Sequence, residues 1–138
     1  MARWTCSRCD REFGRANQSH TCIPGGTVDD SFRGRPQVQR EIYDAIAAYL
    51  ATIGPVHADA VQVGVFLKRE RKFAEVRPMA RALSLDLVLP RLVDDPRIVR
   101  TIRATDRRYV HVLRLSRVAD VDEQVRAWLA ESYLDAVD

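Results

Sequence analysis

The stretch from Val61 to Leu89, VQVGVFLKRERKFAEVRPMARALSLDLVL, decides the fold class. Apolar side chains occupy every second position from Val61 to Leu67 and again from Leu83 to Leu89, as in a β-strand with one buried face. The segment from Phe73 to Met79 lies between them, and short charged or turn-like connectors join the three pieces. Because short connectors make neighbouring strands antiparallel, we predict a three-stranded meander.

Two segments with helical periodicity flank the strands. From Pro36 to Ile53 apolar residues recur at helical spacing, and Gly54-Pro55 ends the segment. A second helix is expected to start near Asp120, because Asp120 and Glu123 resemble a capping box. Its apolar stripe comprises Val121, Val125, Trp128, Leu129 and Tyr133.

The remaining strands are predicted after the meander. The run from Arg108 to Leu115 alternates in character, with Tyr109 and His111 on one face. Arg97 to Thr105 is ambiguous, since its apolar residues fit a helical face while its β-branched run favours a strand. His57, just before the meander, is expected in an exposed turn.

These segments predict an α+β domain over residues 36–138. Its antiparallel sheet has about five strands, and a helix from each end of the domain packs on one face.

Charge is nearly balanced over the 138 residues, with 22 basic and 19 acidic side chains, which does not identify a nucleic-acid-binding protein. It is unevenly placed, however. Residues 91–117 hold eight arginines and three aspartates, whereas residues 118–138 hold one arginine and six acids. Either the acidic helix neutralises the basic strands, or the basic strands form a face for an acidic partner.

The N-terminus is polar, and no apolar run approaches the ~20 residues of a membrane span. We therefore expect a cytoplasmic protein with reduced thiols and no membrane partner.

All three cysteines lie within residues 1–23, where Cys6, Cys9, His20 and Cys22 have the residue types and clustering of a tetrahedral zinc site. The Cys-x-x-Cys turn presents two thiolates to one ion, and His-x-Cys places two ligands on one side of an extended segment. A closed set of four ligands indicates a structural ion in a zinc knuckle. The alternative is a redox-active or disulfide-bonded Cys6–Cys9 pair. A linker that contains Gly and Pro follows the knuckle at residues 24–35.

The segments KFAEVRP, LSLDLVLP, DDPRIVR, RYVHVLRL and DVDEQVRAWLAESY, in this order, resemble an uncharacterised bacterial domain family. It is a domain of unknown function that also ends some larger proteins described as predicted transport proteins. The resemblance covers roughly residues 36–137, and some relatives carry a head matched here by Trp4, Cys6, Cys9, His20 and Cys22. It implies a strand over Arg97–Ala104 and no established activity.

One polar constellation is a candidate for ligand or proton chemistry. Glu75 and Arg77 share a strand face, Asp86 is mid-strand next to them, and Tyr109 and His111 share a face of a later strand. If these faces coincide, they form one polar surface. The alternative is ordinary cross-strand ion pairs with a satisfied, partly buried histidine.

Arginine-rich segments raise the possibility of nucleic-acid binding. The candidate phosphate contacts are Arg3, Arg8, Arg11, Arg15, Lys68, Arg69, Arg71, Lys72, Arg100 and Arg103.

No catalytic motif accompanies these residues, so we predict a non-enzymatic, zinc-containing binding module for a partner protein. The alternatives are a DNA- or RNA-binding protein, and a small-molecule-binding or enzymatic domain built around His111.

Overall fold

Alternating leucines place β6 (Leu83–Leu89) near the middle of a six-stranded antiparallel sheet. The structure is a computed structural model, and it describes residues 4–7, 12–18 and 26–137. The strand order is β3-β4-β5-β6-β8-β7. The other strands are β3 (His57–Val61), β4 (Gly64–Lys68), β5 (Lys72–Pro78), β7 (Ile98–Arg103) and β8 (Tyr109–Leu115).

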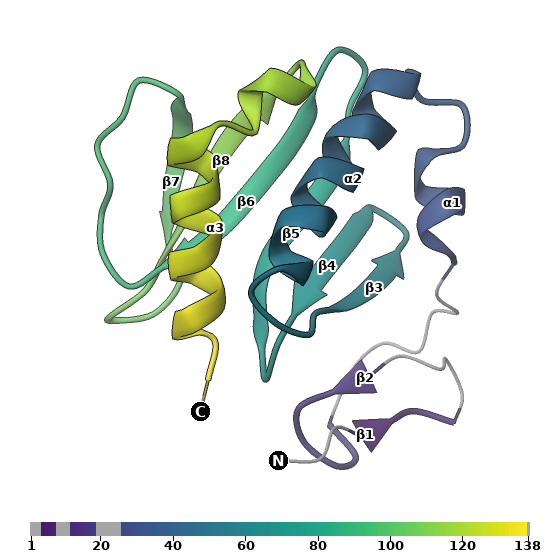
Figure 1. Ribbon diagram of the computed structural model, residues 1–138. Coiled ribbons are helices and arrows are strands. Elements are labelled where there is room, and N and C mark those ends of the chain that lie inside the picture. Colours follow the sequence, from purple (N-terminus) through teal and green to yellow (C-terminus); the bar gives the residue numbers. More distant parts are fainter. Residues whose placement is uncertain (1–3, 8–11, 19–25, 138) are drawn as a thin grey trace.

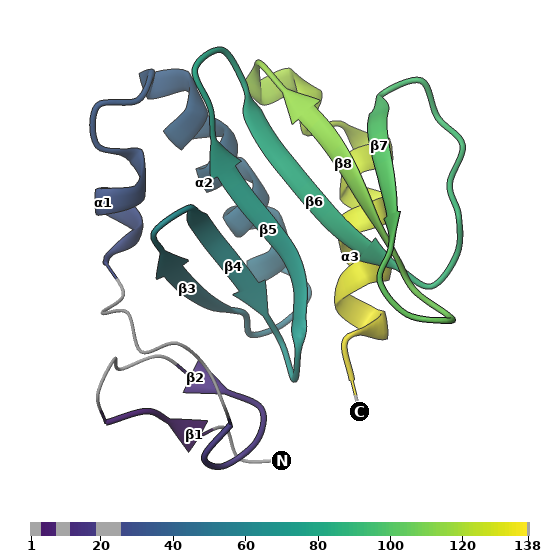
Figure 2. The ribbon, with the colours of Figure 1, turned by 180° about the vertical axis from the view of Figure 1, so that it is seen from behind.

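Both long helices cover the same face of this sheet, as Figure 1 shows. These are α2 (Gln37–Ala51) and α3 (Glu123–Asp135). The reverse view in Figure 2 shows the other face, which no described helix covers. The mixed α+β class is confirmed, and the expected strand at Arg97–Ala104 is β7.

The prediction of about five strands was wrong because the first predicted strand is a hairpin. Val61 pairs with Gly64, so Gln62 and Val63 form the tip between β3 and β4. Val63 is 58% exposed, although the alternation had placed it in a strand with a buried face. His57 is the first residue of β3 and not part of a turn.

The core lies between the helices and the four leucines at alternate positions of β6, each at most 1% exposed. All five residues of the predicted C-terminal stripe are buried. The predicted cap at Asp120 was wrong, because Asp122 caps α3 by accepting a hydrogen bond from Val125 N. Asp120 instead ends a short 3-10 turn, η1 (Val118–Asp120).

A short helix occupies part of the expected linker. Thr27 caps α1 (Val28–Phe32) with a reciprocal capping box to Asp30. Phe32 is buried, and its ring centroid lies 5.3 Å from that of Tyr43. This segment therefore belongs to the core of the domain.

The head contributes a second, two-stranded sheet of β1 (Trp4–Thr5) and β2 (Glu12–Phe13). Over the described ranges, no helix combines the length and apolar character needed to cross a membrane.

Gly64 tests the packing of β4 against β5. A Cβ atom at this position would lie 2.3 Å from the carbonyl oxygen of Val76, so the backbone would have to shift. We expect Gly64→Ala to lower the free energy of unfolding by about 1–3 kcal/mol in urea denaturation. The neighbouring control Val63→Ala should stay within about 0.5 kcal/mol of wild type. Equal stability of the two variants would contradict the tight packing.

Candidate interaction surfaces

Three of the predicted polar residues meet on the helix-free face of the sheet. The strand register sets Glu75 opposite Asp86 and Arg77 opposite Ser84. Lys72 Nζ donates to Glu75 Oε1 at 2.9 Å, and Arg77 Nε lies 3.5 Å from Glu75 Oε2. Burial, followed by the neighbouring Glu75 carboxylate, raises the pKa of Asp86. Lys72 and Arg77 therefore balance the charge of the Glu75 carboxylate within the sheet, as in ordinary ion pairs on a sheet surface.

The other two predicted residues, Tyr109 and His111, lie on the opposite, helix-covered face. His111 pairs with Leu87 of the core, whereas Asp86 pairs with Val112. Because successive residues of a strand alternate between faces, the five residues do not form one surface. The interpretation that all five residues share one surface fails because it depends on how β6 pairs with β8. The sequence pattern of each strand alone does not give that pairing.

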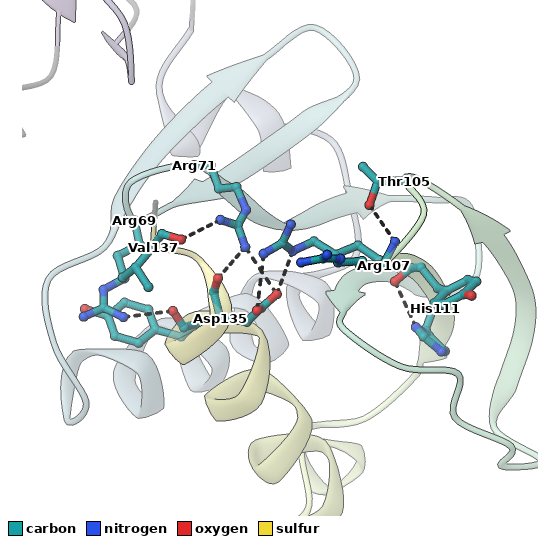
Figure 3. A network of polar contacts seen from close by, with 10 residues as sticks. Arg69, Arg71, Thr105, Arg107, His111, Asp135 and Val137 are labelled. Atoms are coloured by element: carbon teal, nitrogen blue, oxygen red, sulfur yellow. Dashed lines mark hydrogen bonds and ion pairs between the residues drawn. The ribbon is translucent and has the colours of Figure 1, made fainter.

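His111 is fully buried, and its ring connects the segment that follows β6 with strand β8. Its Nε2 accepts a hydrogen bond from Val93 N at 3.0 Å, and its Nδ1 lies 3.2 Å from the carbonyl oxygen of Tyr109 (Figure 3). These partners assign a neutral ring with the proton on Nδ1. Burial lowers the pKa of His111, and protonation of Nε2 would remove the acceptor for Val93.

An apolar row crosses the helix-free face beside the polar cluster. Val88 pairs with Val110, and Val110 pairs with Ile102, so three β-branched side chains lie side by side on β6, β8 and β7. Val112 lies in the next row of the same face and is only 4% exposed, Val88 and Val110 are half-buried, and Ile102 is 43% exposed. We call Val88, Ile102, Val110 and Val112 the open patch.

Two arginines border the open patch. Arg100 pairs with Val112, and its side chain has no hydrogen-bond or ion-pair partner among the described residues. Arg114 pairs with Ser84 and donates to its hydroxyl at 2.8 Å. The alternation of Val110 and Val112 was visible in the sequence, but the neighbouring strands that complete the patch were not.

Arg69 and Arg71, from the charged turn between β4 and β5, bind the end of α3 (Figure 3). Arg69 Nη1 donates to the carbonyl oxygen of Tyr133 at 3.2 Å. Arg71 donates to the carbonyl oxygen of Val137 at 2.9 Å and also contacts the main chain and carboxylate of Asp135. Arg71 therefore satisfies carbonyl groups at and just after the C-terminal end of α3, while the Tyr133 carbonyl group bound by Arg69 also accepts from Ala136 N.

The lysines of the same turn are also engaged. Lys68 Nζ lies 2.9 Å from Asp59 Oδ2, with both side chains less than a tenth exposed. Lys72 binds Glu75. The predicted nucleic-acid contacts at 68–72 are thus used within the fold, whereas Arg15, Arg100 and Arg103 are exposed. The candidates Arg3, Arg8 and Arg11 lie outside the described residues.

The uneven charge of the sequence is explained by contacts between α3, its N-cap and the chain after β6. The pairs, each with an N–O distance of 2.7–2.9 Å, are Arg91–Glu131, Arg97–Asp122 and Arg108–Asp135. This geometry supports the interpretation that the acidic segment neutralises the basic one.

The described part of the head fits one end of the predicted zinc knuckle. Trp4 pairs with Phe13 and Thr5 with Glu12, so the chain that leaves Cys6 returns beside it. Cys6 is 4% exposed and packs with Phe13. The other predicted ligands, Cys9, His20 and Cys22, lie outside the described residues. Within the described ranges, no group of three or more His, Cys, Asp or Glu side chains is placed to hold a metal ion.

The head packs where β3 begins and β4 ends (Figures 1 and 2). Glu12 Oε2 lies 3.0 Å from His57 Nδ1, and the carbonyl oxygen of Glu12 accepts from Lys68 Nζ at 3.0 Å. Lys68 Nζ also lies 4.8 Å from the centroid of the Phe13 ring. Polar and cation–π contacts therefore fix β2 against the domain.

Two cavities lie near strands that carry or adjoin the predicted polar residues. One of about 430 Å³ lies between α2 and the β3–β4 hairpin and has a mainly apolar lining. Another of about 550 Å³, beside the β7–β8 turn, is lined by Tyr109, Arg91, Arg107 and Arg108. Arg91 and Arg108 are paired with acids of α3, and Glu75 lines neither cavity.

Comparison with known proteins yields one match. The model of a family described as a domain of unknown function (DUF5655) matches residues 28–136. The matched range starts with α1 and leaves out the head. No curated protein and no solved structure matches the chain. The resemblance to a domain of unknown function is thus confirmed for the domain.

The environment of His111 predicts a pH dependence of stability. Its folded pKa lies below the ordinary value of 6.5, so the unfolded chain binds more protons as the pH falls below that value. The hydrogen bonds of neutral His111 therefore contribute above about pH 6.5 and are lost as the pH falls through the folded pKa. We expect the difference in unfolding free energy between wild type and His111→Gln to narrow between about pH 7.5 and about pH 5.5.

Urea denaturation at a series of pH values measures this difference. The control Tyr109→Phe keeps the imidazole and the carbonyl group of residue 109, so its difference from wild type should not change with pH. A constant difference for His111→Gln would contradict the assignment.

Proposed function

The chain belongs to the DUF5655 family of domains of unknown function, and we propose that it is a non-enzymatic binding module that docks an acidic segment of a partner protein on the open patch. The observation that carries this proposal is the apolar row on the helix-free face. The solvated face of an antiparallel sheet is ordinarily polar. Contiguous exposed apolar surface with a polar border is a feature of protein interaction sites.

The charges around the open patch select the kind of partner. Arg100, Arg114 and one acid, Asp86, border the patch, and the guanidinium of Arg100 has no partner among the described residues. A carboxylate on the partner would supply a bidentate acceptor for such a group. The apolar row would supply affinity through the area it still exposes, chiefly at Ile102, at about 25 cal/mol per Å² of apolar surface buried. An acidic segment with interspersed apolar residues combines both features.

The alternative functions have weaker support. For nucleic acid, the turn at 68–72 would be the densest basic cluster, but its side chains hold Asp59, Glu75 and the end of α3. For proton chemistry, His111 is buried and its Nε2 already accepts a hydrogen bond from the main chain.

Selection from displayed random peptides tests the docking proposal. We expect peptides with Asp or Glu interspersed among apolar residues to be enriched. Ile102→Asp and Arg100→Glu should each weaken binding of the enriched peptides by about tenfold or more, because each removes a favourable contact and adds a repulsive one. The control Val63→Asp changes an exposed apolar residue at the β3–β4 turn, far along the strand order from β7, and should bind as wild type does.

Labelled DNA and RNA, tested with the same proteins at low salt, separate the alternatives. Binding of nucleic acid without enrichment of acidic peptides would replace the proposal with the nucleic-acid function. Enrichment of basic or uncharged peptides would also contradict it.

For the head, we propose a structural zinc ion held by Cys6, Cys9, His20 and Cys22. Two features of the described residues support it. The β1–β2 pairing folds the segment after Cys6 back on itself, as a metal knuckle requires. The head has only a small apolar cluster around Cys6, Phe13 and Trp4 among its described residues, so a metal would supply much of its folding free energy.

Elemental analysis of the purified protein tests the zinc site. We expect about one zinc ion per chain, and loss of most of it in Cys6→Ser. The matched control His57→Ala changes a histidine that contacts the head without being a proposed ligand, and it should keep its zinc. Zinc-free wild type after expression in zinc-supplemented medium, or full occupancy in Cys6→Ser, would contradict the site.

A further inference from the structure

We propose that the acidic segment binds as a seventh strand along the free edge of β7. This inference rests on the docking function above and adds the way in which the partner is held. β7 is the last strand of the sheet, and its residues from Val99 to Arg103 are all exposed. Edge strands that expose their backbone accept extended peptides as added strands.

The two edge strands of the sheet, β3 and β7, differ in what packs against them. At the β3 edge, α1 packs against the strand, with Phe32 buried in the core (Figure 1). At the β7 edge, the chain between β6 and β7 passes on the outer side of the strand, as both views show (Figures 1 and 2). Its backbone bond to the strand runs from Ile98 N to the carbonyl oxygen of Asp95, at the beginning of β7. The part of the edge beyond Ile98 has no such bond from that described segment.

The ladder between β7 and β8 shows which backbone groups face outward. Ala104 N donates to the carbonyl oxygen of Arg108 at 2.9 Å, and the same register pairs Ile102 with Val110. Hydrogen-bonded pairs alternate along an antiparallel ladder, so Ile102 bonds inward to β8. Thr101 and Arg103 therefore direct their N–H and C=O groups to the free edge.

The charge of β7 favours an acidic segment over a second copy of this chain as the added strand. Two β7 strands in contact would bring Arg100 and Arg103 of one copy near those of the other, and like charges across strands are destabilising. Arg103 pairs with Asp106 at 3.1 Å, but both side chains are well exposed, so this pair contributes little and can be exchanged. An acidic residue on the helix-free face of the added strand satisfies Arg100, whereas Arg103 lies on the other face, opposite Tyr109.

The open patch sets the pattern of the added strand. A strand beside β7 extends the row of Val88, Val110 and Ile102 by one position, which calls for an apolar side chain. Two residues away on the same face, the neighbour of Arg100 would be an acid. The ligand pattern is therefore an apolar residue and an acidic residue separated by one position, in either chain direction.

A blocked octapeptide of repeated Val-Thr-Glu-Thr serves as the probe, with binding followed by nuclear magnetic resonance titration. Two N-methylated versions carry the methyl groups either on all Val and Glu residues or on all Thr residues. In an added strand, alternate N–H groups face the receptor. We expect one methylated version to bind about tenfold or more weakly, and the other to bind nearly as well as the parent peptide.

The protein side of the experiment uses Thr101. Amide hydrogen exchange of Thr101 and Arg103 should slow on peptide binding, because their N–H groups become bonded. Thr101→Pro removes one outward donor and should lose binding by about tenfold or more, whereas the control Thr101→Val keeps the donor and should bind as wild type does. The methylated peptides give the same information on unaltered protein.

The outcomes separate the two proposals. If the parent peptide binds, but both methylated versions bind alike and exchange at Thr101 and Arg103 is unchanged, strand addition is overturned while docking on the open patch stands. If the parent peptide does not bind to wild type at low salt, the docking function and the added strand both fail.

Discussion

The burial of alternating leucines on β6 against α2 and α3 is the constraint on which the other features depend. Leu83, Leu85, Leu87 and Leu89 are at most 1% exposed, so Ser84, Asp86 and Val88 must point to the helix-free face. A slip of one residue would exchange the two sets and bury a carboxylate in the core. The register with β5 and β8 then places the polar cluster and the open patch side by side. The candidate surface is thus a consequence of the way in which the core is packed.

The local pattern of apolar residues was sufficient to predict those elements whose structure is decided by the burial of one face. The strand at Leu83–Leu89 and the stripe on α3 were predicted because period two and helical spacing each imply a single buried face. The pattern misled at Val63, where an apolar residue at a hairpin tip continued the alternation of the strands on both sides. It also misled at Asp120, because Asp122 competes for the same cap and bonds Val125 N.

The candidate site needed information that no single segment contains. The pairing of Glu75 with Asp86 follows from the short connector between β5 and β6, but the face shared with β8 depends on a longer connection. β8 inserts between β6 and β7 in the sheet, so β7 and not β8 becomes the edge. Sequence order suggests the reverse arrangement. Only the topology therefore shows that Arg100 and Ile102 lie at an exposed edge beside an apolar row.

The basic residues divide into those that hold the fold together and those that are available to a partner. Arg69 and Arg71 bind the end of α3, and Lys68 joins Asp59 to the main chain of the head. A buried pair such as Lys68–Asp59 is costly to break on one side, because it leaves an uncompensated charge. Docking of the head, which supplies the Glu12 carbonyl group and the Phe13 ring, therefore stabilises the end of the β3–β4 hairpin. The arginines of β7 have no comparable structural duty, so a partner at that edge can bind them without weakening the core.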